Sequence, residues 1–496
     1  MKLFKFNGGV HPEEHKQITS AKPIRVMPMP KRLYVPLQQH IGAPAEPAVK
    51  VGDTVLKGQL LANSQGAISA PVHAPTSGMI VDISDHPAPH PSGLPVRTIV
   101  LESDGEDKWV DLPSMDADPL RTDGAEIALR VGAAGIVGMG GATFPSAVKL
   151  RLGSRNKIHM LVLNGGECEP YLTCDDRLMQ ERADGIVDGA RIILHTIKAE
   201  KALLVVEDNK PVAIAALQKA CEHAGNLRVV VVPAQYPMGS EKHMIKAVTG
   251  LEVPAGGLGA DIGVLVHNMG TAYAVHQAIR HHRPLISRVI TVGGGAVKEP
   301  QNVEVPIGTL LSDVIAFCGG LSEPPARTLM GGPMMGQMMP SLNVPVVKGT
   351  SGVIALTAQE VSAQTVMPCI RCGSCVGACP CGLLPLQMAA HAKAGNLDKV
   401  VDFGLVDCVS CGCCSYVCPS HIPLVQYFNY AKGEIAARQQ AKHKTQENRR
   451  LVEQRTQRLE REAQLKADAA AKRKAEADAR KAAQAAKAVN AELSLD

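Results

Sequence analysis

The chain of 496 residues has no apolar run that approaches the ~20 residues a helix needs to cross a bilayer. Its first nine residues contain no apolar core of the length found in signal peptides. Both absences argue against an integral membrane protein and against a secreted one, so we expect a soluble or peripheral chain. Aromatic residues make up only 3% of the sequence, so we expect cores built from Val, Ile, Leu, Ala and Met.

A strong charge of either sign is also lacking. The formal net charge is +5, and the segment from residue 431 onward carries 16 Lys and Arg against 10 Asp and Glu, while the whole chain has 52 against 47. The body therefore has no basic surplus with which to bind nucleic acid. The length itself predicts about three domains.

Cysteine is plentiful by contrast, and eight of the 14 cysteines follow one spacing that occurs twice, Cys-x-x-Cys-x-x-Cys-x-x-x-Cys-Pro. This is the spacing of bacterial two-cluster ferredoxins, in which the fourth cysteine ligates the other cluster. The proline after it prevents the helix from continuing and fixes the turn. We predict one 4Fe–4S cluster on Cys369, Cys372, Cys375 and Cys418, and a second on Cys408, Cys411, Cys414 and Cys379.

Two other interpretations of these cysteines are weaker. Zinc sites use two Cys-x-x-Cys pairs rather than three cysteines in succession. Disulfide frameworks belong to small secreted chains, whereas the expected compartment here is reducing. Cys381 and Cys413 lie in the same region outside the spacing, and we interpret them as small apolar residues near the clusters.

The N-terminal part, residues 1–110, is expected to form a small β module. After an extended lead-in of about 30 residues, short apolar runs alternate with Gly and Pro turns from Leu33 to about Leu101. The runs beginning at Val51 and Ala74 resemble the two halves of a biotinyl/lipoyl-type barrel-sandwich domain. Carrier domains of that type have a modifiable lysine between the halves, but residues 63–72 contain none. A structural module is therefore favoured over a swinging-arm carrier.

Residues 120–285 are expected to form a second domain. Four apolar runs, 159–163, 202–206, 227–232 and 262–266, alternate with helical stretches such as 211–224 and 240–248. This pattern predicts a parallel α/β sheet covered on both faces. Such sheets bind ligands in the loops beyond the carboxyl ends of their strands.

The first loop of interest is the glycine-rich segment 135–149. Glycines allow backbone N–H groups to approach a phosphate closely, and the start of the following helix favours an anion. Pro145 suits the first turn of that helix, and Lys149, one turn further, is positioned to reach a phosphate or a nucleotide. A glycine-rich turn without a ligand is an equally good interpretation of this loop taken alone.

The second loop, residues 164–171, follows the strand that ends at Leu163 and places Glu167 and Glu169 one residue apart. Buried carboxylates without partners are costly, so such a pair rarely serves packing. The alternative is a solvated acidic turn.

The third loop, residues 267–271, also lies between a strand and a helix. Asn268 and Thr271 offer uncharged hydrogen bonds suited to a flavin ring or a ribityl chain. Ordinary capping of the following helix explains them equally well.

Together the three loops resemble the flavin and NADH site of the flavoprotein subunit of respiratory complex I. This resemblance implies FMN as cofactor and NADH as substrate. The sequence departs from that family at Met139, Thr143, Leu150 and Cys168, where the family has Arg, Gly, Trp and Gly. Matching positions that the resemblance assigns to cofactor binding are Gly138, Gly140, Gly141, Phe144, Lys149, Asn164, Glu167, Glu169 and Asn268, with Pro145 and Pro170 also matching.

Three further segments complete the chain. Residues 286–345 resemble the β-grasp domain that follows the flavin domain in the same family, and the Met-rich stretch 331–339 reads as a packing loop rather than a metal site. Residues 360–428 form the expected α+β two-cluster ferredoxin domain, with a helix at 386–397. Residues 431–496 are expected to be a solvated helix, frayed or disordered without a partner.

The whole order, covering about residues 1–430, resembles the C-subunit family of Rnf (Rsx) ion-translocating electron-transport complexes. That resemblance implies a translocase subunit that is peripheral at the cytoplasmic face of the inner membrane. Its expected partners are integral-membrane and ferredoxin-like subunits, NADH and ferredoxin. Two alternatives remain: a non-catalytic electron-transfer adapter whose nucleotide site has decayed, and a soluble ferredoxin-type oxidoreductase without a membrane partner.

Overall fold

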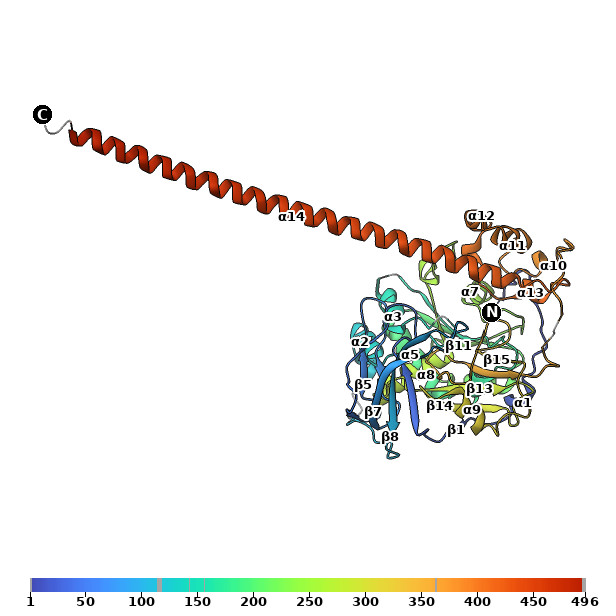
Figure 1. Ribbon diagram of the computed structural model, residues 1–496. Coiled ribbons are helices and arrows are strands. Elements are labelled where there is room, and N and C mark those ends of the chain that lie inside the picture. The colour runs from blue at the N-terminus through green and yellow to red at the C-terminus, as the bar shows by residue number, and fades with distance from the viewer. Residues whose placement is uncertain (1, 114–117, 142, 156, 362–363, 493–496) are drawn as a thin grey trace. The chain divides into compact units, whose positions relative to one another are not determined.

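The computed structural model describes residues 2–113, 118–141, 143–155, 157–361 and 364–492. The chain divides into two compact units, residues 1–428 and 429–496. The first unit contains all of the sheets and every helix labelled in Figure 1 except α14 (Leu424–Glu492), most of which lies in the second unit. Short helical turns outside the domains discussed below are α1 (Gln17–Ser20) and the 3-10 turn η1 (Pro119–Arg121).

Residues 32–103 form a β module of two antiparallel sheets. One has the strand order β2–β8–β7–β4 and the other β3–β5–β6. Leu33, Leu61 and Leu101 are fully buried in one cluster that draws on both sheets, so the module has its own core. The turn between β5 and β6 contains no lysine. The strands are β2 (Arg32–Pro36), β3 (Glu46–Pro47), β4 (Thr54–Val55), β5 (Leu60–Asn63), β6 (Val72–His73), β7 (Gly78–Pro87) and β8 (Pro95–Ser103).

The α/β domain is built on a four-stranded sheet, all of it parallel, in the order β11–β10–β9–β12. The strands are β9 (Met160–Gly165), β10 (Lys201–Glu207), β11 (Leu227–Val232) and β12 (Val264–Asn268). Its helices are α2 (Gly124–Ala133), α3 (Ser146–Arg155), α4 (Cys174–Glu181), α5 (Ala183–Ile197), α6 (Pro211–Ala220), α7 (Glu241–Thr249) and α8 (Met269–His281).

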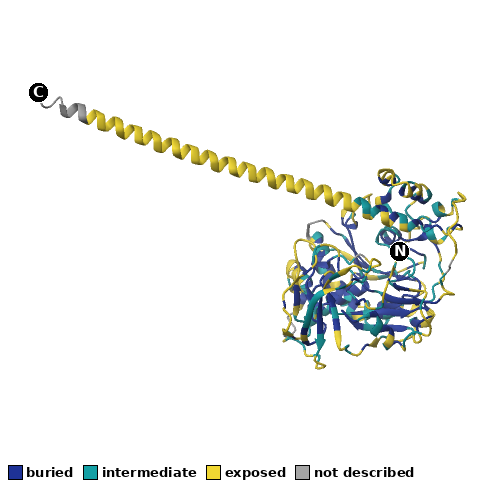
Figure 2. Cartoon of the chain, viewed as in Figure 1, coloured by how far each residue is buried: buried dark blue, intermediate teal, exposed yellow. Residues whose placement is uncertain are grey.

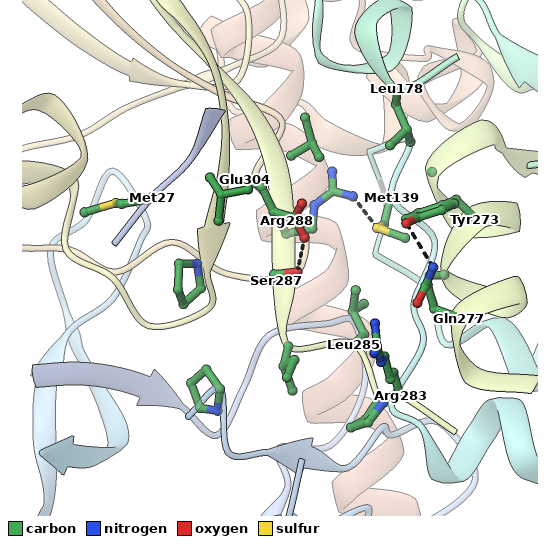
Figure 3. A pocket seen from close by; sticks show the side chains of 18 of the residues that line it. Met27, Met139, Leu178, Tyr273, Gln277, Arg283, Leu285, Ser287, Arg288 and Glu304 are labelled. Atoms are coloured by element: carbon green, nitrogen blue, oxygen red, sulfur yellow. Dashed lines mark hydrogen bonds between the residues drawn. The ribbon is translucent and has the colours of Figure 1, made fainter. Parts of the chain in front are cut away.

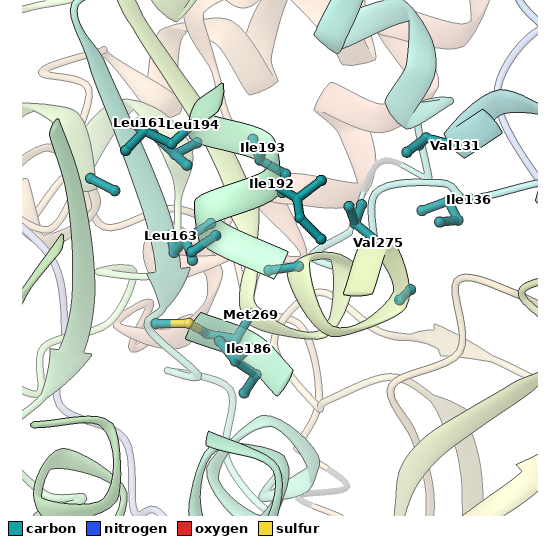
Figure 4. Close-up of a cluster of buried hydrophobic side chains, with 14 of the residues drawn as sticks. Val131, Ile136, Leu161, Leu163, Ile186, Ile192, Ile193, Leu194, Met269 and Val275 are labelled. Carbon is teal, nitrogen blue, oxygen red and sulfur yellow. The ribbon is translucent and has the colours of Figure 1, made fainter. Parts of the chain in front are cut away.

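Alternate residues of each strand serve two different cores, as expected for a sheet that is covered on both faces. Leu161 and Leu163 of β9 join the cluster formed with α2, α5 and α8, part of which is drawn in Figure 4. Met160 and Val162 join a second cluster, with Met244 of α7, on the opposite face. The predicted parallel sheet is therefore confirmed.

One strand begins later than the sequence indicates. The apolar run starts at Ile262, but that residue ends the 3-10 turn η2 (Gly259–Ile262), and β12 starts at Val264. Gly263 between them has φ +71°, a left-handed conformation that breaks an extended strand. Residues 221–224 likewise lie beyond the end of α6.

A domain of β-grasp type follows, with a six-stranded sheet in the order β1–β14–β13–β17–β15–β16. Its edge strand β1 (Arg25–Val26) comes from the predicted lead-in and pairs with β14 in parallel. The sheet also continues past the expected boundary at residue 345, because β17 pairs with both β13 and β15. The other elements are β13 (Ser287–Gly293), β14 (Gln301–Pro306), α9 (Leu311–Phe317), β15 (Arg327–Met330), β16 (Gln337–Met338) and β17 (Gly352–Leu356).

The cysteine-rich region is helical and repeats itself. A short helix opens each half, α10 (Ser374–Gly377) and α13 (Cys413–Tyr416), each preceded by a glycine in the left-handed conformation. The helix predicted over 386–397 is two helices, α11 (Pro385–Lys393) and α12 (Leu397–Asp402), because Gly395 at φ +72° separates them. The 3-10 turn η3 (Leu405–Asp407) precedes the second half.

The last helix, α14 (Leu424–Glu492), contains most of the second unit. Its residues 436–487 are all exposed, as Figure 2 shows in yellow, and so the solvated helix expected there is what the structure describes. Among helices of the described residues, none combines the length and the apolar character needed to cross a membrane.

The packing of α5 against α8 depends on one glycine. A Cβ atom added at Gly189 would lie 1.9 Å from the backbone oxygen of Ala272, so the two helices would have to separate. Overpacking of this kind costs about 1–3 kcal/mol or more. We expect Gly189→Ala to lower the main calorimetric melting temperature of the purified chain.

The matched control is Gly433→Ala, because a Cβ there meets no atom within 4 Å and lies on an exposed part of α14. Alanine is favoured over glycine in a helix by about 1 kcal/mol, so this variant should not lower the melting temperature. Equal melting of Gly189→Ala and the unmodified chain would show that the α5–α8 contact is looser than described.

Candidate cofactor site

The three predicted loops meet at the carboxyl ends of β9 and β12. Met139 of the glycine loop donates its backbone N–H to Thr271 Oγ1 at 3.0 Å. A Cβ at Gly140 would lie 3.2 Å from Cβ of Asn268, so a larger residue here would require the first and third loops to shift apart slightly. Gly141, at φ +132°, has no atom within 4 Å of a Cβ position and borders open space.

Asn268 is held at both ends of its side chain. Its Oδ1 accepts hydrogen bonds from the backbone N–H of Gly270 and Thr271, at 2.8 and 3.3 Å, and so caps α8. Its Nδ2 donates to Asp175 at 2.6 Å. Asn268 therefore caps α8 in this structure.

Lys149 lies on α3, which begins at Ser146, one residue after Pro145. Its ammonium donates to the backbone oxygen of Val266 at 3.0 Å and to Glu241 at 3.1 Å. Both partners lie near the carboxyl end of β12. The side chain is 26% exposed, so the ammonium remains accessible beside the glycine loop.

The acidic loop is buried rather than solvated. The Glu167 carboxylate accepts the backbone N–H groups of Asp175 and Asp176, at 2.9 and 3.2 Å, at the start of α4. Burial raises the pKa of Glu167. Glu169 accepts from the backbone N–H of Met334 at 2.9 Å, and burial raises its pKa to about 7.

Asn164 also bonds within the loops. Its Oδ1 accepts the Gly166 N–H at 2.9 Å, and its Nδ2 donates to the backbone oxygen of Gly239 at 2.8 Å. Of the other predicted residues, Phe144 accepts the Gly138 N–H through its backbone oxygen at 2.8 Å. The Gly138–Phe144 bond closes the first loop into a tight turn.

Sequence reasoning missed the cation that holds the acidic loop. Lys16, 8% exposed, donates to the backbone oxygens of Glu167, Glu169 and Leu172 at 2.8, 2.8 and 2.5 Å. It lies about 150 residues away in the chain, and no local pattern marks it. Glu207, at the end of β10, is likewise buried and pairs with Lys210 at 2.5 Å.

Two buried polar atoms beside these loops lack hydrogen-bond partners among the described residues. They are Ser146 Oγ, at the start of α3, and His267 Nε2, at the end of β12. Burial and the charge of Lys149 lower the pKa of His267 to about 3, so its ring is neutral. Buried polar atoms normally have partners, so these two fit a ligand with hydrogen-bonding groups, such as FMN, beside the first and third loops.

The cysteines of the repeated spacing gather in two crossed groups. Cys369, Cys372, Cys375 and Cys418 line one cavity, of about 170 Å³, and we call them the outer set. Cys379, Cys408, Cys411 and Cys414 line another, and we call them the inner set. The thiols surround a space rather than converging on one point, and no described group of three His, Cys, Asp or Glu side chains could hold a single metal ion.

The two sets differ in their surroundings. Cys369 and Cys372 of the outer set are exposed, whereas Cys411 and Cys414 of the inner set are buried. Tyr236 of the α/β domain donates its hydroxyl to the backbone oxygen of Cys411 at 2.6 Å. The inner set is therefore the one anchored to the α/β domain.

Two further contacts hold the inner half of the cysteine-rich region, one from the α/β domain and one from the N-terminal segment. His243 Nε2 lies 3.2 Å from the backbone oxygen of Pro380, and Gly9 donates its N–H to the backbone oxygen of Ala378 at 3.0 Å. Tyr236 also reaches Glu169 at 3.4 Å, so one side chain touches the acidic loop and the inner set. Cys413 is fully buried and Cys381 partly buried, and neither belongs to the repeated spacing. Cys381 nevertheless lines the inner cavity.

Sequence-family models match the chain in four successive segments. They are the RnfC barrel sandwich hybrid domain at residues 4–106, the Nuo51 FMN-binding domain at 131–277, the SLBB domain at 289–337 and the 4Fe-4S dicluster domain at 368–422. The predicted fold class, with these domains in this order, is confirmed.

Curated relatives agree with those segments. The C subunit of the ion-translocating oxidoreductase complex of Rhodobacter capsulatus is 53% identical over 89% of this chain and 85% of its own length. The chain belongs to this C-subunit family. The C subunit of the proton-translocating ferredoxin:NAD(+) oxidoreductase complex of Clostridium ljungdahlii is 46% identical over 88% of the chain and 95% of its own length. The Pseudomonas aeruginosa family member is 47% identical over 92% of the chain but 59% of its own length.

This member of the C-subunit family thus contains an FMN-binding domain and a 4Fe-4S dicluster domain, as the sequence predicts. Among solved structures, an NAD+-reducing [NiFe]-hydrogenase in the H2-reduced state is similar over 65% of this chain and 62% of its own, with 18% identity and a TM-score of 0.47. A likeness that distant fixes no residue's role.

The raised pKa of Glu169 gives a prediction with a definite sign. The folded chain holds the Glu169 proton more tightly than the unfolded chain, whose ordinary pKa is 4.5. The stability from that proton is fully present below the ordinary pKa and is lost as pH rises through about 7. Glu169→Gln should therefore gain stability relative to the unmodified chain between about pH 5 and pH 8, by about 3 kcal/mol at most.

The measurement is urea unfolding of both chains at several pH values across that range. Glu222→Gln serves as the control, because Glu222 is exposed. If the difference in free energy of unfolding between Glu169→Gln and the unmodified chain does not change with pH, the Glu169 carboxyl titrates as an ordinary one.

Proposed function

We propose that this chain is the peripheral C subunit of a membrane complex that couples electron transfer between NADH and ferredoxin to ion translocation. The observation that carries the proposal is the union, on one chain of the C-subunit family, of an FMN-binding domain and a 4Fe-4S dicluster domain. We place the chain at the cytoplasmic face of the inner membrane, with ion movement assigned to integral-membrane subunits and ferredoxin as the redox partner.

We further propose that the outer and inner cysteine sets each ligate one 4Fe–4S cluster. The crossed grouping of the two thiol-lined cavities supports this, because it pairs the fourth cysteine of each half with the first three of the other. The clusters, when bound, carry single electrons. The protein's part is to enclose the inner set among its own side chains while leaving Cys369 and Cys372 of the outer set exposed.

We also propose roles in FMN binding for the residues of the three loops. FMN, when bound, supplies a group that takes two electrons as a hydride and gives them up singly. The Lys149 ammonium and the backbone N–H groups of Gly140 and Gly141 would bind its phosphate end, while Gly138 closes the turn of the loop through its bond to Phe144. Asn164, Phe144 and Asn268 shape the walls, and Glu167 and Glu169 line the loop beyond β9.

The contacts of Tyr236, His243 and Gly9 set the order of the two cluster sites. Tyr236 and His243 tie the inner set to the domain that carries the flavin loops, and Gly9 ties it to the N-terminal segment. The exposed Cys369 and Cys372 leave the outer set open to another protein of the complex. We infer that electrons pass between the flavin domain and the inner set, and between the outer set and a partner.

A second candidate is the non-catalytic adapter. It is favoured by the internal bonding of the flavin residues, since Lys149 already pairs with Glu241 and Asn268 caps α8. An adapter would hold clusters and pass electrons without binding NADH or FMN.

Cluster ligation is tested by one matched pair of variants. Cys411→Ser removes a predicted ligand of the inner set, and Cys413→Ser changes a fully buried neighbour that is not a predicted ligand. After anaerobic purification we expect Cys411→Ser to hold about half the iron and sulfide of the unmodified chain. Cys413→Ser should hold the full amount, and equal contents in the two variants would overturn the proposed ligand sets.

Flavin chemistry is tested with Lys149→Ala. The chain reconstituted with FMN, iron and sulfide should oxidise NADH with an artificial one-electron acceptor, and Lys149→Ala should lower both FMN affinity and NADH-driven cluster reduction about tenfold or more, as expected for loss of a charge-assisted bond. Lys219→Ala, on the exposed face of α6, is the control. Unchanged reduction in Lys149→Ala, or no flavin binding at all, would favour the adapter.

A further inference from the structure

The two halves of the cysteine-rich region have closely similar backbone conformations. Each residue of the first half has a counterpart at a constant spacing in the second, as Cys369 has in Cys408. The counterparts Arg371 and Ser410 both have φ +55°, and each donates its backbone N–H to the sulfur two residues earlier at 3.4 Å. A difference in surroundings between the two halves therefore comes from what packs on them, not from their own shape.

The inner loop, residues 409–413, is covered by the protein itself. Its Val409 packs against the apolar cluster that contains Tyr236, and the Tyr236 hydroxyl bonds to the backbone of the same loop. A Cβ added at Gly412 would lie 3.0 Å from the backbone oxygen of Met334, so the chain also closes over the middle of the loop.

The outer loop, residues 370–374, is bare by contrast. Ile370, the counterpart of Val409, is 69% exposed. A Cβ added at Gly373, the counterpart of Gly412, meets no described atom within 4 Å. One loop shape is therefore enclosed where it faces the α/β domain and uncovered where it faces away from the described chain.

Exposed apolar side chains continue just before the outer loop. Val366 and Met367 are 52% and 56% exposed, so three large apolar side chains, with Ile370, lie within five residues. The segment is held in place, because Met367 donates its N–H to the backbone oxygen of Ser420 at 3.0 Å. A single exposed apolar residue is ordinary, but a group of them marks an interaction surface.

The charges beside this surface are of one sign. Arg371 and Lys393 are the charged side chains among the described residues that line the outer cavity, and both are exposed. Lys393 lies 4.8 Å from the centre of the Tyr427 ring, and neither cation has a carboxylate within 4.0 Å among the described residues. Complementary charges steer two proteins together, so these cations favour a partner with an acidic surface.

We propose that the outer loop and the two apolar residues before it are the docking surface of a second protein, which presents apolar side chains to Ile370 and carboxylates to Arg371 and Lys393. That protein takes, on the outer half, the place that Tyr236 and its neighbours take on the inner half. The inference rests on the proposed function, in which the outer set exchanges electrons with a partner. One electron passes between the outer cluster and a one-electron group of the partner, an iron–sulfur centre or a flavin, with no bond formed or broken.

The test uses the full purified chain with its clusters, and membranes of the source organism from which this chain is absent. Binding is measured by co-sedimentation with the membranes. Electron transfer is measured by reoxidation of clusters that were reduced with dithionite, so neither measurement needs flavin or NADH. We expect Ile370→Asp to bind the membranes about tenfold or more weakly, because docking would bury an unpaired charge. Val406→Asp is the matched control, because Val406 is also 69% exposed but lies ahead of the inner loop.

The acidic character of the partner is tested with Arg371→Glu. This variant should associate with the membranes more slowly and lose most of the salt dependence of association, because charges at the rim act chiefly on the association rate. Lys219→Glu, on the exposed face of α6, is the control. If Arg371 serves only the outer cluster, Arg371→Glu changes the iron content and leaves association unchanged, which overturns an acidic partner.

Iron and sulfide contents of all variants are measured before binding is compared. If Ile370→Asp assembles its outer cluster poorly, Val366→Asp makes the same test three residues before the first predicted ligand. Val366→Asp should also weaken membrane binding.

Equal membrane binding and reoxidation in the unmodified chain, Ile370→Asp and Val366→Asp would overturn the inference and leave the proposed function intact. If the unmodified chain neither binds the membranes nor loses electrons to them, the proposed function fails, and this inference fails with it. A purified chain that changes from dimer to monomer in Ile370→Asp would assign the outer loop to a second copy of the chain. Faster trypsin cleavage beyond residue 431 in Ile370→Asp would assign it to the chain's own tail, and either result overturns the docking of a partner.

Discussion

A single buried ammonium group fixes the geometry on which the rest of the site depends. Lys16 gathers three backbone oxygens of the acidic loop, so the loop cannot turn outward to solvent. With the loop in this shape, Glu167 reaches the first turn of α4 and Glu169 reaches Tyr236. Tyr236 in turn holds the loop of Cys411. The N-terminal segment therefore connects a domain of flavin type to a cysteine-rich domain more than 200 residues later.

Short sequence patterns predicted the elements that depend mainly on neighbouring residues. Continuous apolar runs identified β9 to β12 on the parallel sheet. The two cluster ligand sets stay a prediction from the cysteine spacing, and the cysteines of each predicted set line one cavity. Boundaries failed where backbone conformation outweighed composition, as at Gly263 and Gly395. In both places the flanking residues suit the predicted element, but a left-handed glycine interrupts it.

Features that depend on distant residues were beyond the sequence. Lys16, and Arg288 of β13, carry no motif, and their contacts arise only from the partners that the fold brings to them. The same applies to β1 and β17, two short strands that complete the β-grasp sheet from outside its expected range. The sequence indicated where the three flavin loops lie, but not the hydrogen bonds that their side chains make.

Met139 illustrates how a departure from a familiar pattern acquires meaning in three dimensions. The glycine loop has methionine where the resembling family has arginine, which in the sequence alone reads as a lost positive charge. In the fold, the guanidinium of Arg288 lies against the Met139 sulfur, so a positive charge reaches this part of the loop from a strand of the next domain. The glycine loop therefore packs against a strand of the next domain (Figure 3), so the packing of the two domains sets the charge beside the loop.

The unequal burial of the two cysteine sets has a consequence for handling the protein. Oxidants reach accessible thiolates first, and Cys369 and Cys372 are exposed while Cys411 and Cys414 are enclosed. Air would therefore attack the outer set before the inner set. In the proposed order of electron transfer, brief exposure to oxygen would damage the site that faces the partner before the site that faces the flavin domain.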